Sequence, residues 1–422
     1  MKIIFVNRYF YPDESATSMV LSDLAFHISS KNYVYEGSEQ MLRPLNTEVH
    51  VITSRQIYDN AGVKLPATEI VNHVRVHRVW TTRFGRHNLA GRLLDYLTFY
   101  SSAVMRLTLL ASGNDIVIIK TDPPLLSIPA WLVSRLRGAV QINWLHDLFP
   151  EVAITYGVRG LGSMAGNILI KLRNFTLVHS RMNVVIGERM QQKLMQEQVP
   201  AEKIRVIHNW SEGLPATSVP HKGNPLVRKW GLQDKFVVAY SGNLGRGHEF
   251  RTIIDAARDL REHRNIIFLF IGGGAHFQQV IREQQALELH NILFKPYQPR
   301  ALLKYSLALP HVHLVTLAPG MGGLMVPSKI YGIAAAGRPM LYIGDEDSEV
   351  PGIIAAADCG MNIKVGAVDD LVRAILMMQE NSQRLEEMGR KGRKTFDERY
   401  SSRRAYRQWE EVITLSLRER VG

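Results

Sequence analysis

The chain has only one cysteine, Cys359, among its 422 residues. A single cysteine excludes an internal disulfide framework and any metal site built from several cysteines, so we interpret Cys359 as a small core residue. No run of about 18 uncharged apolar residues occurs, and none of the segments is therefore predicted to span a membrane. Zinc-ligand spacing and aromatic-rich RNA-binding motifs are also missing, which argues against nucleic acid as a partner.

The composition is that of a globular protein with ample core. Hydrophobic residues make up 46% and charged residues 21% of the chain, and the length favours two domains. The net charge of +12 favours an anionic partner, either a phosphorylated metabolite or an acidic membrane face. The alternative is a basic surface without a binding role.

Short β-rich runs alternate with helical patterns through both halves of the chain. The first apolar run is too short for a secretory signal and is expected to be a strand. The expected strands of the first half are Lys2–Val6, Val49–Thr53, Arg75–Val79, Asp115–Ile119, Gln141–Leu145, Asn183–Ile186 and Arg205–Ile207. Those of the second half are Phe236–Tyr240, Ile266–Ile271, Ile292–Phe294, His313–Thr316, Met340–Ile343 and Met361–Ile363. Alternation of this kind predicts two α/β domains, each a doubly wound parallel sheet.

The expected domains are residues 1–208 and 209–401, with a final helix over 402–422 that crosses back to the first domain. Two such domains would face a central cleft, because open α/β sheets bind ligands at the carboxyl ends of their strands. The connection over residues 31–46 is longer than the usual ~2–6 residues between a helix and a strand. The sequence offers no physical reason for this length.

The segment Phe236–Phe250, FVVAYSGNLGRGHEF, has the outline of a phosphate-binding turn. Gly242 and its neighbouring glycines would let backbone N–H groups approach an anion, Asn243 lies in the same turn, and Arg246 adds a cation. The alternative is an ordinary strand-to-helix turn. Ser328 and Lys329 open a predicted helix, and a lysine in a first turn suits the helix dipole only when an anion is present. We therefore expect Lys329 and Arg246 to share a diphosphate.

His146 and Asp147 follow an expected buried strand at the end where α/β sheets place ligands. An imidazole there would hydrogen-bond a ligand and support a transition state without acting as a nucleophile. The alternative is that His146 bonds backbone carbonyls and Asp147 caps a turn. Glu151 is a weaker candidate for the same site.

These motifs resemble those of the family-4 retaining glycosyltransferases of the two-domain GT-B type, especially bacterial enzymes of exopolysaccharide, O-antigen and colanic-acid-like glycan synthesis. The resemblance rests on the segments NRYFYPDESATS, LHDLFPE, IRVIHNWSE, SGNLGRGHEF, FKPYQPRALL and VPSKIYGIAAAGRP, which span nearly the whole chain. It implies a GT-B fold of two Rossmann-like domains, the first on the acceptor side and the second binding the nucleotide sugar. It also implies a donor-sugar role for His146 and Asp147, and a base-binding role for Tyr297.

The sequence departs from the family pattern at several positions. Ser15, Ala16 and Thr17 replace a Gly-Gly pair at the loop near the donor phosphate and the acceptor. Two glutamates that contact the donor sugar and the ribose are replaced by glycines, at Gly322 or Gly323 and at Gly332. Asn243 stands where many relatives carry a second phosphate-binding arginine, which places more of the phosphate binding on Arg246.

The predicted function is retaining transfer of a hexosyl or N-acetylhexosaminyl group from a nucleoside diphosphate, with UDP favoured, to a polyprenyl-diphosphate-linked glycan. Neither a cofactor nor a metal is expected, because fixed cations and backbone dipoles stabilise the leaving group. The alternatives are a nucleotide-sugar 2-epimerase of the same fold and a non-catalytic nucleotide-sugar-binding protein. The expected location is the cytoplasm.

The segment Leu89–Ala111 carries more apolar residues than one core-facing stripe needs. Basic residues flank or interrupt it, namely Arg86, His87, Arg92 and Arg106. This pattern predicts peripheral contact with the anionic inner face of the cytoplasmic membrane. A buried crossover helix is the alternative.

Overall fold

The computed structural model describes residues 1–31, 47–58, 65–85, 89–158, 160–211 and 219–418. The long connection over residues 32–46, Arg86 and His87 lie outside the described residues. The chain divides into two compact units, the first of residues 1–207 and 406–422 and the second of residues 208–405. The division expected from the sequence, at 208/209 with a returning C-terminal helix, lies close to this one.

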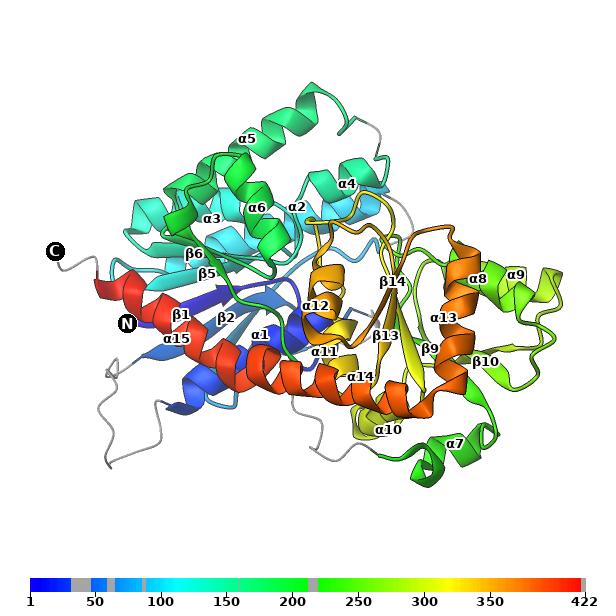
Figure 1. Cartoon of the computed structure of the whole chain (residues 1–422). Coiled ribbons are helices and arrows are strands. Elements are labelled where there is room, and N and C mark those ends of the chain that lie inside the picture. Colours follow the sequence, from blue (N-terminus) through cyan, green and yellow to red (C-terminus); the bar gives the residue numbers. More distant parts are fainter. Residues whose placement is uncertain (32–46, 59–64, 86–88, 159, 212–218, 419–422) are drawn as a thin grey trace. The chain divides into compact units, whose positions relative to one another are not determined.

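The first unit is built on an eight-stranded sheet with the order β3-β4-β2-β1-β5-β6-β7-β8 (Figure 1). Its strands are β1 (Lys2–Val6), β2 (Glu48–Ser54), β3 (Thr68–Val71), β4 (Val74–Val79), β5 (Ile116–Lys120), β6 (Val140–Leu145), β7 (Met182–Val185) and β8 (Ile204–Val206). Its helices are α1 (Ala16–Lys31), α2 (Leu89–Leu110), α3 (Ser127–Arg137), α4 (Glu151–Thr155), α5 (Met164–His179) and α6 (Glu188–Gln196). The neighbouring strands pair in parallel except at the β3 edge.

The last helix, α15 (Ser402–Arg418), packs within the first unit from Tyr406 onward. The buried ring of Trp409 lies 4.6 Å from that of Trp144 on β6. Glu410 accepts a bond of 2.9 Å from His27 of α1. Two aromatic side chains without solvent contact therefore fix this helix against the sheet.

The second unit contains a six-stranded, all-parallel sheet with the order β11-β10-β9-β12-β13-β14. Its strands are β9 (Phe236–Asn243), β10 (Ile266–Gly273), β11 (Ile292–Lys295), β12 (Val312–Thr316), β13 (Met340–Ile343) and β14 (Gly360–Ile363). Its helices are α7 (Pro225–Lys229), α8 (Arg251–Asp259), α9 (Phe277–Ala286), α10 (Leu303–Ala308), α11 (Lys329–Ala335), α12 (Glu349–Ala357), α13 (Val368–Glu380) and α14 (Ser382–Thr395). This is the Rossmann order. The strands after β9 are added on one side of it as far as β11, and the chain then returns to add β12 on its other side, so the strand order reverses between β9 and β12.

Two parallel α/β sheets confirm the fold class expected from the sequence. The antiparallel edge strand β3 was not predicted, because its four residues form no apolar run. Asn72 and His73 join it to β4 with φ values of 46° and 66°, the backbone of a tight hairpin turn. Six helices were also not predicted, namely α4, α5, α7, α9, α12 and α14.

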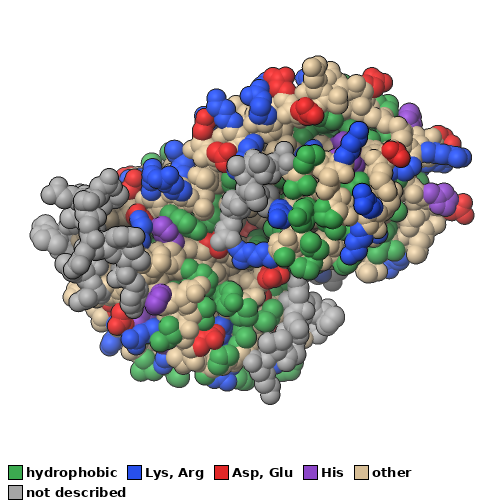
Figure 2. Space-filling model, turned by 90° about the horizontal axis from the view of Figure 1, so that it is seen from below, with side chains coloured by type: hydrophobic (Ala, Val, Ile, Leu, Met, Phe, Trp, Pro, Cys, Tyr) green, Lys and Arg blue, Asp and Glu red, His purple; other side chains and the backbone are tan. Residues whose placement is uncertain are grey.

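Basic side chains are dispersed on the face drawn in Figure 2, where Lys and Arg lie among acidic and apolar residues. The excess positive charge therefore marks no single binding surface on that face. None of the helices within the described ranges is both long enough and apolar enough to cross a membrane.

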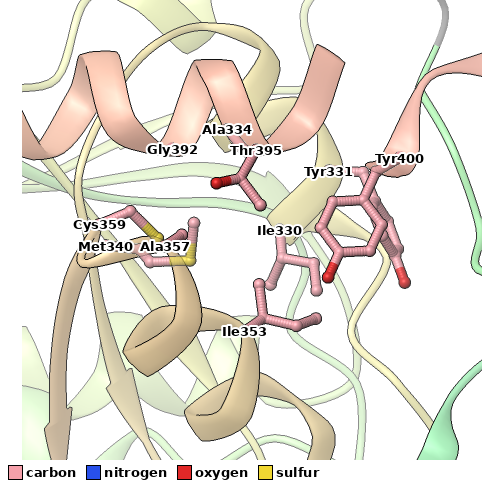
Figure 3. A pocket seen from close by; sticks show the side chains of 10 residues that line it. All are labelled: Ile330, Tyr331, Ala334, Met340, Ile353, Ala357, Cys359, Gly392, Thr395 and Tyr400. Atoms are coloured by element: carbon pink, nitrogen blue, oxygen red, sulfur yellow. The ribbon is translucent and has the colours of Figure 1, made fainter. Parts of the chain in front are cut away.

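A small pocket in the second unit carries no candidate chemistry. Figure 3 shows that mainly apolar side chains line it, with the sulfur atoms of Met340 and Cys359 on one side and the hydroxyls of Thr395 and Tyr400 nearby. Cys359 is buried, as expected for a core residue, and burial raises the pKa of its thiol to about 11. A protonated thiol in apolar surroundings is a packing group.

Candidate functional site

The carboxyl ends of β9 and β10 run side by side in the second unit. Gly242 pairs with Gly272, and Asn243 pairs with Gly273. The strand therefore continues through Ser241, Gly242 and Asn243, which the sequence had placed in a turn, and α8 follows from Arg251. A side chain on Gly272, whose φ is 137°, would lie 2.3 Å from the Gly242 carbonyl oxygen. Only glycine allows these two strand ends to approach so closely.

Lys329, the first residue of α11, extends its side chain across the end of β9. Its Nζ lies 3.4 Å from the ring centroid of Tyr240, and its Cε would lie 3.8 Å from a Cβ at Gly242. The side chain as a whole is half-buried, but Nζ has no contact with solvent and no hydrogen-bond partner among the described residues. Burial lowers the pKa of Lys329 well below its ordinary value. The structure thus brings together Gly242 and Lys329, two residues that the sequence assigned to one phosphate site.

The turn after β9 is fixed to the end of β12. Gly247 accepts a backbone bond of 2.8 Å from Ala318, and the Nδ1 of His248 lies 2.7 Å from the carbonyl oxygen of Thr316. Burial, and then the charge of Lys329, lower the pKa of His248 to about 3, so the imidazole is neutral and donates to Thr316. Since the order of strands reverses between β9 and β12, Lys329 lies at the position where such sheets bind ligands.

The other predicted residues of this unit surround the same strand ends. Arg246 is exposed and makes no hydrogen bond or ion pair with described residues. The side chain of Asn243 is exposed, and the backbone carbonyl oxygen of this residue accepts a bond of 2.9 Å from the Tyr240 hydroxyl. Tyr297 is 52% exposed, with its ring 3.2 Å from the position of a Cβ at Gly273. Ser328 directly precedes α11 and makes no side-chain capping bond.

In the first unit, His146 and Asp147 follow β6, beside the end of β5. The backbone N–H of His146 donates to the Thr121 hydroxyl at 3.2 Å. Its ring Nε2 is buried without a hydrogen-bond partner among the described residues, so bonding of this nitrogen to a backbone carbonyl is not observed. Burial, and secondly Lys120, lower the pKa of His146 well below its ordinary value. A neutral imidazole with an unused nitrogen is available to hydrogen-bond a ligand.

Lys120 and Asp122 complete this group, and sequence reasoning missed both. The Nζ of Lys120 lies 3.8 Å from the Trp144 ring centroid and donates to the Thr17 carbonyl oxygen at 3.0 Å. Burial, and then the charge of Asp122, raise the pKa of Asp147 to about 6, against the opposing effect of Lys120. A charged residue at the end of the otherwise apolar strand IVIIK was the signal in the sequence.

One of the three residues predicted to present N–H groups to phosphate, Ser15, is already bonded within the chain. The Ser15 N–H donates to the Asp13 carboxylate at 2.9 Å, and the Ser15 hydroxyl bonds the same carboxylate. Ala16 and Thr17 form the first turn of α1. Glu151, the weaker candidate, pairs with the buried Arg173 at 2.6 Å and belongs to a structural ion pair.

Two family models match this chain and together cover most of it. A glycosyl transferase 4-like domain matches residues 37–210, and a domain of the glycosyl transferases group 1 matches residues 225–395. The chain belongs to the glycosyltransferases that combine a 4-like domain with a group 1 domain. The first matched segment falls almost entirely within the first α/β unit of this chain, and the second falls within the second unit.

Curated relatives of this family member include two bacterial proteins. WbjE of Pseudomonas aeruginosa, named as a glycosyltransferase, is 32% identical over 61% of this chain and 64% of its own. WcaI of Escherichia coli strain K12, named as a glycosyl transferase of colanic acid biosynthesis, is 28% identical over 55% of this chain and 58% of its own. The matches span less than two thirds of each relative.

A solved structure shares the fold over nearly the whole chain. The crystal structure of Anabaena Alr3699/HepE in complex with UDP-glucose superposes with a TM-score of 0.71 and 13% identity. The match covers 98% of this chain and 99% of the other. The GT-B architecture expected from the sequence is therefore confirmed.

Proposed function

We propose that this protein transfers a sugar from a nucleoside diphosphate to a glycan acceptor of bacterial surface polysaccharide synthesis. The observation that carries the proposal is the buried ammonium of Lys329, which has no hydrogen-bond partner among the described residues. A buried cation of this kind is unfavourable until an anion neutralises it. Its position beside Gly242, at the reversal of strand order, matches the site of a nucleotide diphosphate.

In the proposed reaction the bond between the anomeric carbon and the diphosphate oxygen breaks. An acceptor hydroxyl oxygen forms the new bond to that carbon and gives its proton to the departing diphosphate. Negative charge then grows on the leaving diphosphate, where Lys329 and Arg246 would stabilise it without a metal ion. Binding of the diphosphate would raise the pKa of Lys329, because an adjacent anion favours the charged amine.

The donor we propose is a UDP-sugar. Support comes from the fold shared with HepE, which was crystallised with UDP-glucose. Tyr297 offers an exposed ring beside Gly273 on which a base would stack. His146 and Asp147 would contact the transferred sugar, and retention of its anomeric configuration follows from the family resemblance.

The acceptor we propose is a lipid-linked glycan at the cytoplasmic face of the membrane. The names of WbjE and WcaI support glycosyl transfer, and that of WcaI supports surface polysaccharide synthesis. Polysaccharide repeats assembled on polyprenyl diphosphate present a sugar hydroxyl near an anionic surface. A basic protein with a net charge of +12 suits that location.

The test is calorimetric UDP binding by Lys329→Met and Arg246→Ala variants. Loss of a charged hydrogen bond costs about 1.5–3 kcal/mol, so each should weaken UDP binding by about 10- to 150-fold. Lys304→Met is the matched control, because Lys304 also lies over a tyrosine ring, at 4.9 Å from the centroid of Tyr305. Donor turnover that persists in the double variant would contradict the diphosphate site. Product formed without any acceptor would instead identify an epimerase.

A further inference from the structure

Helices α3 and α5 lie side by side on one face of the first sheet (Figure 1). The ring of Phe175 on α5 lies 5.1 Å from that of Trp131 on α3, so the two helices touch through aromatic side chains. Large apolar side chains nevertheless point outward from both. The α3–α5 face consists of Leu132, Leu136, Met164, Ile168, Leu172 and Phe175, each between 45% and 78% exposed. The four residues from α5 follow helical spacing and form one stripe.

The charges on this face all have one sign. Neither α3 nor α5 contains an aspartate or a glutamate. Arg135 and Lys171 are exposed and make no ion pair with described residues. Arg173 differs, since it is buried and pairs with Glu151 and Glu197. An exposed apolar stripe bordered by unpaired cations has the chemistry of a surface that binds anionic lipid.

We infer that the α3–α5 face docks on an anionic lipid bilayer. Leu172 and its neighbours would enter the boundary between headgroups and acyl chains, while Arg135 and Lys171 would contact lipid phosphates. A second copy of the chain is a poorer occupant, because a symmetric interface would bring these cations against their own equivalents. Because neither helix carries a carboxylate, Arg135 and Lys171 of one copy would find no opposite charge on α3 and α5 of the other.

The α3–α5 face is distinct from α2, the membrane-facing helix expected from the sequence, which also exposes large apolar side chains such as Leu97, Met105 and Leu109. Of the basic residues that suggested α2, Arg86 and His87 lie outside the described residues. Arg106 bonds the Nδ1 of His77 at 2.6 Å and so is engaged within the unit. Only Asp95 is acidic in α2, and it is buried against Arg8 at 3.4 Å. We prefer the α3–α5 face because Arg135 and Lys171 are exposed there and make no ion pair with described residues, and the sequence did not suggest it because α5 was not predicted.

This inference rests on the proposed function for its biological setting, since a lipid-linked acceptor brings the enzyme to a bilayer. Its test needs neither donor nor acceptor, so the two can fail separately. The full-length protein is mixed with vesicles of phosphatidylcholine containing increasing phosphatidylglycerol, and the bound fraction is measured by flotation. We expect binding that rises with anionic lipid and weakens with salt.

Two double variants test the surface. Arg135→Gln with Lys171→Gln should lower the partition coefficient on anionic vesicles by about 25-fold, since each basic residue near such a surface contributes a factor of about five. Ile168→Gln with Leu172→Gln should lower it about tenfold or more and remove the binding that survives high salt. Lys229→Gln with Arg282→Gln is the control, because it removes the same charge from exposed positions of the second unit.

The outcomes separate the explanations. If the control variant loses as much vesicle binding as the Arg135→Gln and Lys171→Gln variant, net charge alone drives binding and the inference fails. Absence of vesicle binding by the wild type would also overturn it. Light scattering that shows a dimer lost in the Ile168→Gln and Leu172→Gln variant would assign the face to a second copy. Circular dichroism of each variant confirms that it is folded.

Discussion

Replacing Asp147 by asparagine should stabilise the protein at neutral pH. Burial and Asp122 raise the pKa of Asp147 from its ordinary 3.8 to about 6. Because the folded pKa exceeds the unfolded one, the group contributes stability that is complete below about pH 3.8 and lost as pH rises through about 6. The difference of about two pH units, at about 1.36 kcal/mol each, makes the ionised carboxylate cost about 3 kcal/mol at pH 7. Asparagine has nearly the same shape and never carries that charge.

The assay is urea unfolding of wild type and Asp147→Asn at pH 5 and pH 7. We fit the transition that changes the fluorescence of Trp144 and Trp409, which are both buried in the first unit. The variant should exceed the wild type in free energy of unfolding at both values. The excess should be about 1 kcal/mol greater at pH 7 than at pH 5, since the carboxyl is mostly protonated in the folded state at pH 5.

A matched control is Asp234→Asn, which removes an exposed carboxylate from the second unit. It should change the free energy of unfolding by no more than about 0.5 kcal/mol. An Asp147→Asn variant that is less stable than wild type at pH 7, or whose excess does not depend on pH, would refute the reasoning.

The same substitution should separate stability from activity. If the ionised Asp147 contacts the transferred sugar, as proposed, kcat/KM of the wild type rises with pH through about 6. The asparagine variant should lose activity while gaining stability, because a partly buried charge that serves function destabilises the fold.

Three further outcomes follow from the structure. Gly272→Ala should lower the free energy of urea unfolding by roughly 2–4 kcal/mol and weaken UDP binding, because its Cβ would meet the Gly242 carbonyl at a φ of 137°. The control Gly352→Ala, with open space around it, should be neutral or stabilising. Arg173→Ala should cost about 3–5 kcal/mol, measured by urea unfolding, because it leaves the carboxylates of Glu151 and Glu197 without their buried partner. Treatment with a chelator should leave donor turnover unchanged, since protein cations neutralise the leaving diphosphate in the proposed mechanism; a loss restored by added divalent cation would contradict it.

The alternation of apolar runs made the parallel sheets predictable, because strands buried on both faces leave a strong signal. Lys2–Val6 is identical in prediction and structure. The antiparallel β3 and helix α5 were missed for different reasons. Thr68–Val71 is a short, half-exposed edge strand, and the packed side of α5 buries Gly166, Arg173 and Thr176 beside Leu177 while its apolar stripe is exposed. A helix whose apolar residues do not mark its packed side lacks the usual sequence signal of an amphipathic helix.

For the site, motifs predicted which residues lie at strand ends but not which of them touch. The glycine turn and Lys329 are more than 80 positions apart, and the contact between Lys329 and the Tyr240 ring depends on how α11 returns to β9. Lys120 was missed because it ends a strand without belonging to any motif. Its importance comes from burial and from Asp122 and Asp147 nearby, which only the folded chain places together.

Comparison of the two buried lysines indicates where an external anion is needed. Each lies over an aromatic ring at a strand end, Lys120 over Trp144 and Lys329 over Tyr240, and burial lowers the pKa of both. Asp122 and Asp147 oppose that effect at Lys120, whereas burial alone sets the pKa of Lys329. The first unit therefore compensates its buried cation internally. Among the described residues of the second unit no counter-charge opposes the effect of burial on Lys329, and the proposed diphosphate would supply it.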